Sequence, residues 1–105
     1  SLMKKNCIIV NSARGGIINE QSLIHALENK SVLAAGVDVF EQEPPSVNHP
    51  IFKFENVLLS PHNSALTVEC RKRMAVEASE TIIFYLKDKS SLNLDNLVNK
   101  KYLNI

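Results

Sequence analysis

Residues 10–16 read V-N-S-A-R-G-G, and this stretch lies between a short apolar run and a segment with helical spacing. The apolar run is Cys7–Val10, and a run of this length next to turn residues predicts a short strand buried on both faces. Gly15 and Gly16 allow a sharp turn and a close approach to a ligand. Arg14 therefore follows the carboxyl end of a predicted parallel strand, where open α/β sheets bind ligands. The alternative is a surface arginine in an ordinary strand-to-helix turn.

The composition is that of a soluble globular piece of at most one small domain. The chain has 105 residues, of which 45% are hydrophobic and 22% charged, and its net charge is +1. This balance predicts no binding to nucleic acid or to an anionic membrane. We expect neither a membrane span nor a targeting leader. Cys7 and Cys70 form no CxxC pair and no metal-site spacing, which favours reduced thiols, a cytoplasmic location and no metal.

The order of the predicted elements indicates an α/β fold. Leu23, Ile24 and Leu27 give one apolar helix face, and Asn19 is the expected N-cap. A strand, a helix and a second strand in this order predict a right-handed βαβ crossover and a parallel sheet. The expected elements are strands at 7–10, 32–40 and 56–60, helices at 19–29 and 67–87, and a tail at 90–105 that is an extended arm or short turns. The second helix is apolar on more than one side, which predicts cover by more than one layer or by a partner.

Three polar side chains stand out in this pattern. Asp38 is the only charge in the second predicted strand, so it should be paired or directed at a polar ligand. His25 lies off the apolar helix stripe and is expected to be solvated. His49 precedes a proline in a loop and is expected at the surface.

Arg14, Glu43 and His62 each follow a predicted strand, so the fold should gather them at one edge of a parallel sheet. A guanidinium holds a carboxylate in a bidentate manner and polarises an adjacent carbonyl. An imidazole transfers a proton near neutral pH, and a neighbouring carboxylate orients it. This chemistry suits the interconversion of an alcohol and a ketone beside a carboxylate when a hydride carrier is present. Spacing alone does not establish it, since these residue types are common.

Three blocks of the sequence, in order, resemble the signature blocks of the D-isomer-specific 2-hydroxyacid dehydrogenases. They are N-S-A-R-G-G-I-I-N-E-Q-S-L, A-A-G-V-D-V-F-E-Q-E-P-P and N-V-L-L-S-P-H-N-S-A-L-T. The resemblance covers nearly the whole chain and implies a partial Rossmann-type parallel sheet. It implies the C-terminal half of an NAD-binding domain over residues 1–89, including the long helix, followed by a tail at 90–105.

The resemblance also implies roles for individual residues. Arg14 matches the arginine that binds the substrate carboxylate and carbonyl. His62 matches the general acid/base, and Glu43 matches the carboxylate paired with that histidine, with Glu41 as its rival. Asp38 matches the aspartate that contacts the nicotinamide carboxamide. The other matches to the nicotinamide pocket, partly through backbone atoms, are Ser12, Ala13, Asn63, Ser64 and Ala65, with Arg14 and His62 also counted in that site.

The chain departs from the family in length and in one motif. It has three glycines and no G-x-G-x-x-G, so the cradle for the cofactor pyrophosphate is missing, together with the acidic residue that selects NAD over NADP. We therefore expect a fragment that binds NAD weakly, is inactive alone, and self-associates as a homodimer or larger assembly or binds a complementary chain.

The implied activity interconverts a D-2-hydroxy acid and a 2-keto acid with NAD, NADP not being excluded. D-3-phosphoglycerate dehydrogenase activity of serine biosynthesis is the first expectation, and hydroxypyruvate or glyoxylate reduction is the second. A non-catalytic NAD-sensing module is the alternative, because the same fold occurs in a nucleotide-sensing transcriptional corepressor that retains the trio.

Overall fold

The computed structural model describes residues 2–103. The chain forms two compact units, one ending at Ser64 and the other beginning at Ala65. The first unit contains the sheet and the residues predicted to carry the chemistry.

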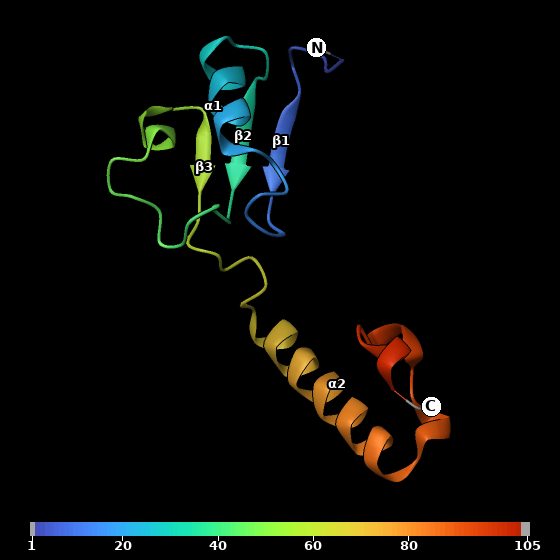
Figure 1. The fold of residues 1–105 in the computed structure, drawn as a ribbon. Coiled ribbons are helices and arrows are strands. Elements are labelled where there is room, and N and C mark those ends of the chain that lie inside the picture. The colour runs from blue at the N-terminus through green and yellow to red at the C-terminus, as the bar shows by residue number, and fades with distance from the viewer. Residues whose placement is uncertain (1, 104–105) are drawn as a thin grey trace. The chain divides into compact units, whose positions relative to one another are not determined.

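The first unit is built on three parallel strands, as the sequence predicts. They are β1 (Ile8–Asn11), β2 (Ala34–Val37) and β3 (Val57–Leu59), in the spatial order β1-β2-β3 (Figure 1). Ile9 is in register with Ala35, and Ala35 with Val57. β2 and β3 are shorter than predicted, whereas β1 has the predicted length and is shifted by one residue toward the C-terminus. β1 ends at Asn11, whose side chain accepts from the Ala13 N–H at 3.2 Å and donates to the Arg14 carbonyl at 3.0 Å.

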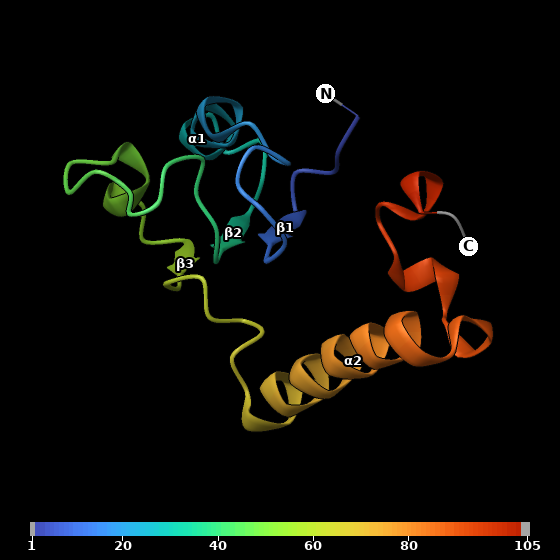
Figure 2. The ribbon, with the colours of Figure 1, turned by 60° about the horizontal axis from the view of Figure 1, so that its bottom comes forward.

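Helix α1 (Glu20–Glu28) covers one face of this sheet (Figure 2). The Asn19 side chain caps it as predicted, by accepting from the Ser22 N–H at 2.9 Å. The short 3₁₀ helix η1 (Pro50–Lys53) adds Ile51, which is fully buried. The core between these elements and the sheet consists of Leu23, Leu27, Val32, Ala35, Val37, Phe40 and Ile51.

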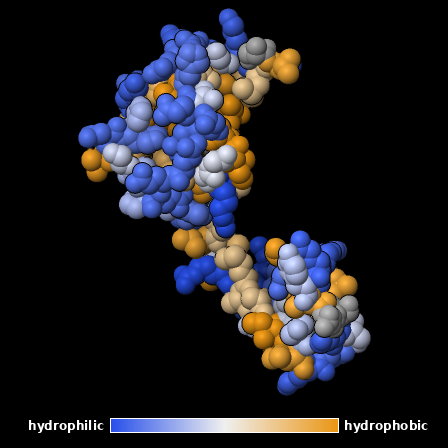
Figure 3. Space-filling model, in the orientation of Figure 1, coloured by the Kyte–Doolittle hydropathy of each residue, from blue (hydrophilic) through white to orange (hydrophobic). Residues whose placement is uncertain are grey.

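The opposite face of the sheet is exposed, so the prediction that the first strand is buried on both faces is wrong. Ile8, Val10 and Leu58 are 59%, 70% and 79% exposed. Side chains alternate between the two faces of a strand, and within the described part of this unit only the other face packs against α1 and η1. Apolar surface is visible on both units in Figure 3.

The second unit contains α2 (Val68–Lys87), which matches the predicted long helix. Thr67 caps it by accepting from the Cys70 N–H at 3.1 Å. None of its described residues is buried. The tail forms short turns, one of the two predicted alternatives, as the 3₁₀ helices η2 (Lys89–Ser91), η3 (Leu94–Asn96) and η4 (Lys100–Tyr102). Among the described helices, none combines the length and apolarity needed to cross a bilayer.

Candidate active site

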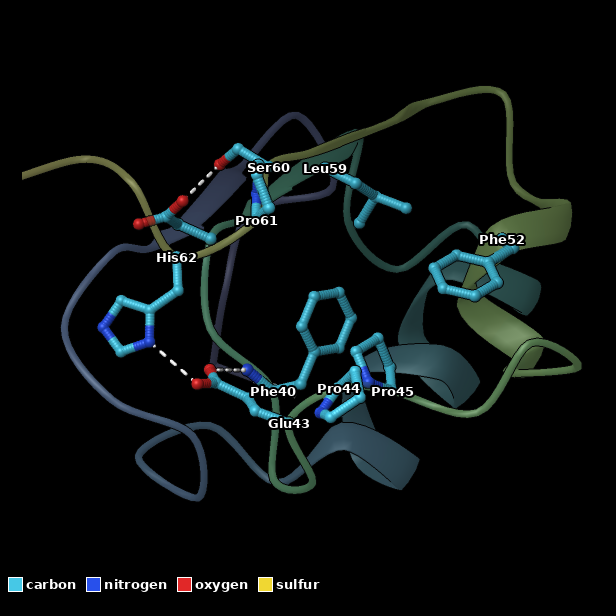
Figure 4. A pocket seen from close by; sticks show the side chains of 10 residues that line it. Phe40, Glu43, Pro44, Pro45, Phe52, Leu59, Ser60, Pro61 and His62 are labelled. Carbon is cyan, nitrogen blue, oxygen red and sulfur yellow. Dashed lines mark hydrogen bonds and ion pairs between the residues drawn. The ribbon is translucent and has the colours of Figure 1, made fainter. Parts of the chain in front are cut away.

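Glu43 and His62 form a hydrogen-bonded pair beyond the carboxyl ends of β2 and β3. The Glu43 Oε2 atom lies 2.8 Å from Nδ1 of His62, and the Glu43 Oε1 atom accepts the Phe40 N–H at 3.0 Å (Figure 4). The two side chains are 39% and 44% exposed, so substrate-sized molecules can reach them. Glu41, the rival candidate, points elsewhere and accepts the Glu20 N–H at 3.1 Å.

The pairing fixes how the imidazole can act. The His62 hydrogen bond and the Phe40 amide hold the pKa of Glu43 below its usual range, with the nearby charges of His62 and Arg14 adding to the effect. Glu43 is thus an ionised acceptor at neutral pH, and Nδ1 of His62 is the donor toward it. Nε2 is the other ring nitrogen and is left to exchange a proton with a ligand, as an imidazole orientated by a carboxylate does in acid–base catalysis.

His62 has a backbone φ of +53°. A residue other than glycine in this left-handed region costs on the order of 1–3 kcal/mol and persists only where its surroundings fix it. Such backbone outliers cluster at active sites and ligand clamps. The hydrogen bonds around Asp38 supply the constraint.

Asp38 ties the segment around His62 to the end of β2. Its Oδ1 atom accepts the Ser60 hydroxyl at 2.5 Å and the Asn63 N–H at 2.9 Å, and its Oδ2 atom accepts the Ser64 N–H at 3.0 Å. These hydrogen bonds hold the pKa of Asp38 far below its usual range, and the Ser60 hydroxyl has the largest effect, followed by the Ser64 amide. The buried charge is therefore paired, as the sequence requires, and its donors lie on both sides of His62 in the chain.

The residues predicted for the nicotinamide pocket lie in part together. The Ser64 hydroxyl donates to the Ser12 carbonyl at 3.4 Å, which joins the end of β1 to the segment after β3. Asp38 binds the Ser60 hydroxyl and the Asn63 and Ser64 amides, and the Ser64 side chain also lowers its pKa. Asp38, Ser12, Asn63 and Ser64 therefore form one polar cluster at this edge of the sheet. Ala65 is the first residue of the second unit.

Arg14 joins the pair only through its charge. Its Nη1 atom donates to the Ala13 carbonyl at 2.6 Å, and its guanidinium is the last and smallest cause of the lowered pKa of Glu43. Arg14 follows the carboxyl end of β1, as the sequence predicts. Of the three predicted catalytic residues, the structure brings Glu43 and His62 into contact. The exposed guanidinium is available to an anionic ligand.

A cavity of about 410 Å³ opens beside the pair. Its lining is mostly apolar, with the Glu43 carboxylate and the His62 imidazole at one side (Figure 4). The ten lining residues are Asp38, Phe40, Glu43, Pro44, Pro45, Phe52, Leu59, Ser60, Pro61 and His62. A concave, largely apolar site with a few convergent polar groups is typical of small-molecule binding. No cluster of three or more potential metal ligands occurs among residues 2–103.

The other two histidines have different surroundings. His25 is exposed on α1, as predicted, and lies 2.9 Å from the Asn29 side-chain nitrogen. The prediction for His49 is wrong, because its side chain is only 15% exposed and its Nε2 atom lies 3.0 Å from Oε2 of Glu20. The aromatic rings of Phe40 and Phe52 pack edge-on against it. Sequence reasoning also missed the role of Ser60, whose position at the carboxyl end of a predicted strand was the available signal.

Comparison with known proteins places this site in a family. Residues 1–64 match the sequence model described as "D-isomer specific 2-hydroxyacid dehydrogenase, NAD binding domain". The chain is 42% identical over 103 residues to a glyoxylate reductase of Thermofilum pendens, covering 98% of this chain and 30% of the relative. It is 43% identical over 99 residues to a D-3-phosphoglycerate dehydrogenase of Methanocaldococcus jannaschii, covering 94% of this chain and 19% of the relative.

Solved structures of similar proteins have the same fold as this chain. A glyoxylate reductase from Paecilomyes thermophila superposes with a TM-score of 0.74 and 33% identity, over 83% of this chain and 26% of that one. An NADPH-dependent glyoxylate/hydroxypyruvate reductase from Sinorhizobium meliloti, solved with NADP and malonate, superposes with a TM-score of 0.71 and 30% identity. This match covers 80% of this chain and 26% of the reductase. The chain spans less than a third of these proteins. The Rossmann-type fold and the matched sequence model together show that the chain belongs to the D-isomer-specific 2-hydroxyacid dehydrogenases.

Proposed function

We propose that this chain supplies the proton-transfer centre of an oxidoreductase that interconverts a 2-keto acid and a D-2-hydroxy acid. The observation that carries the proposal is the 2.8 Å bond between Glu43 Oε2 and His62 Nδ1, which leaves Nε2 of His62 for the substrate. Family membership supports the reaction class. Because the chain covers 30% or less of the curated relatives described above, the activity is proposed for the whole enzyme.

The proposed roles follow from the chemistry of each group. Protonated His62 gives its Nε2 proton to the carbonyl oxygen as the ketone becomes an alcohol, and takes it back in the reverse direction. Glu43 holds Nδ1 throughout and stabilises the charged imidazolium. Arg14 binds the carboxylate of the substrate and polarises the adjacent carbonyl. NAD(H) or NADP(H), when bound, supplies or accepts the hydride.

The proposed cofactor contacts are made by residues around Asp38. Asp38 accepts the N–H of the nicotinamide carboxamide. Ser64 and Ser12 already lie together, which supports a shared pocket wall at the ends of β1 and β3. The remaining proposed contacts are Ala13, Arg14, His62, Asn63 and Ala65.

We propose a small 2-keto acid as substrate, with glyoxylate or hydroxypyruvate first and 3-phosphohydroxypyruvate next. The support is that three glyoxylate reductases are similar to the chain at 39–44% identity and a D-3-phosphoglycerate dehydrogenase at 43%. A serine-biosynthetic role follows only if the phosphorylated substrate is preferred.

The test is a chimera in which this chain replaces the matching segment of the Thermofilum pendens glyoxylate reductase. Oxidation of NADH and NADPH is followed with each of the three keto acids. We expect turnover, and a loss of turnover in Arg14→Ala. A chimera that is folded by circular dichroism and binds NAD(H) but reduces none of the keto acids contradicts the proposal and favours a non-catalytic, NAD-sensing module.

We further propose that the chain in isolation is inactive, binds NAD weakly and self-associates, and that it is cytoplasmic. The lack of a G-x-G-x-x-G motif in its sequence supports weak cofactor binding. Exposed apolar side chains support self-association, and they include Ile8, Val10 and Leu58 on the sheet and Val68, Ile82 and Leu86 on α2. The free thiols Cys7 and Cys70 support a reducing compartment. Light scattering after size exclusion tests the assembly: a clean monomer contradicts it.

A further inference from the structure

A second carboxylate–histidine pair lies in the same unit as the first one. Glu20 is the first residue of α1, and its Oε2 atom is 3.0 Å from Nε2 of His49. Both side chains are only 15% exposed, which sets them apart from the ordinary surface pair Glu28–Lys53, whose side chains are 46% and 61% exposed. Nothing in the proposed reaction uses Glu20 or His49.

The hydrogen bonds of His49 fix its tautomer and its orientation. Its Nδ1 atom accepts the Ile51 N–H at 3.3 Å, so the ring proton is on Nε2 and is donated to Glu20. The rings of Phe40 and Phe52 lie edge-on to the imidazole, each with a centroid distance of 5.9 Å. The imidazole thus holds the Glu20 carboxylate from a fixed position.

The other oxygen of Glu20 reaches the backbone that carries the candidate catalytic carboxylate. Oε1 of Glu20 accepts the Glu41 N–H at 2.6 Å, and Oε1 of Glu41 accepts the Glu20 N–H at 3.1 Å. The preceding amide, the Phe40 N–H, donates to Oε1 of Glu43. Two successive amides are therefore bound by two carboxylates, and each of these carboxylates also binds a histidine.

The peptide bond between Phe40 and Glu41 is held on both sides. Its N–H is bound by Glu20, and its carbonyl oxygen lies so near Gly15 that a Cβ there would be 1.9 Å away. A shift of this peptide would move the Phe40 amide and with it the oxygen of Glu43 that it binds. Displacements of about 1 Å at a catalytic group can cost about 100-fold in rate.

We infer that Glu20 is a positioning residue: held by His49, it anchors the Phe40–Glu41 peptide and thereby orients Glu43 against His62. The inference rests on the proposed function for its catalytic consequence, and on the hydrogen bonds alone for its structural content.

The test compares Glu20→Gln and Glu20→Ala with Glu28→Gln in this chain by NMR. In Glu20→Gln the new amide can still accept the Glu41 N–H, but its NH₂ group faces the Nε2–H of His49. We expect the Phe40 and Glu41 amides to exchange at least about tenfold faster in Glu20→Ala, and less so in Glu20→Gln. We expect the pKa of Glu43 to rise toward its usual value in both. Glu28→Gln removes a charged contact between α1 and η1 and should change neither quantity.

Unchanged exchange of these two amides and an unchanged Glu43 titration in Glu20→Gln overturn the inference. This variant decides the matter even if Glu20→Ala fails to fold. In the chimeric enzyme, Glu20→Gln should lower kcat about tenfold and leave KM for the keto acid unchanged. The loss is smaller than the roughly 100-fold or larger contribution of acid–base catalysis, because His62 is still present and only its orientation is disturbed. An inactive parent chimera overturns the proposed function alone, because the NMR comparison stands without it.

Discussion

The Cα of Gly15 faces the backbone carbonyl of Phe40, and a Cβ built on Gly15 would lie 1.9 Å from that oxygen. This approach joins the turn after β1, which carries Arg14, to the segment after β2, which carries Glu43. The glycine is therefore required by the neighbouring backbone.

Gly15→Ala is expected to destabilise the fold by about 1–3 kcal/mol, the usual cost of forcing extra volume into a packed site. Chemical denaturation followed by circular dichroism measures it. Gly36→Ala is the matched control, since a Cβ there would meet Val10 at 3.5 Å, an ordinary contact. Equal stability of the two variants would contradict this explanation of Gly15.

Ser60→Ala is expected to make the free energy of unfolding less dependent on pH in the acid range. The native pKa of Asp38 lies below the ordinary value of about 3.9. Ionised Asp38 therefore stabilises the fold fully when the pH is above this ordinary value, and the stabilisation is lost as the pH falls through the native pKa. Removal of the Ser60 hydroxyl, the largest cause of the shift, raises the native pKa. The free energy of unfolding should then be lower at neutral pH and fall less toward acid pH.

The measurement is denaturant unfolding at neutral and at acid pH. Ser79→Ala is the control, because the Ser79 hydroxyl donates to the Ala75 carbonyl within α2 and not to a carboxylate. If Ser60→Ala and the parent lose the same stability on acidification, Asp38 is not held by Ser60 as described.

His62→Ala is expected to raise the pKa of Glu43 toward its ordinary value of about 4.3. The hydrogen bond from His62 is the largest cause of the lowered pKa, and the Phe40 amide remains in the variant. The stabilising effect of ionised Glu43, present above its ordinary pKa and lost as the pH falls through the native pKa, should shrink accordingly. Carboxyl-carbon NMR titration measures the pKa directly. A Glu43 titration that is the same in His62→Ala as in His25→Ala would show that the pair does not form in solution.

The sequence predicted the candidate site residues where they lie in short contiguous motifs at the ends of predicted strands. The turn after Val10, the Glu43–Pro44 step and the Pro61–His62 step follow apolar runs, and the parallel order of the strands brings their ends to one edge. Helix caps at Asn19 and Thr67 were also predictable, because capping depends on residues three positions apart.

The missed features depend on loop geometry. Glu20 and His49 are 29 residues apart, and their pairing is set by how the loop after β2 folds back toward α1. The exposed sheet face was missed for a different reason. The apolar run at 7–10 indicates what the strand could bury, whereas burial depends on which elements pack against each face.

The central claim, that His62 is the acid–base group, is tested most directly by replacing each of the three histidines with alanine in the chimeric enzyme. His25→Ala should retain full turnover, and His49→Ala should retain part of it. His62→Ala should lose about 100-fold to 10,000-fold in kcat, the range that general acid–base catalysis contributes. A folded His62→Ala enzyme that turns over glyoxylate as fast as His25→Ala would contradict the claim.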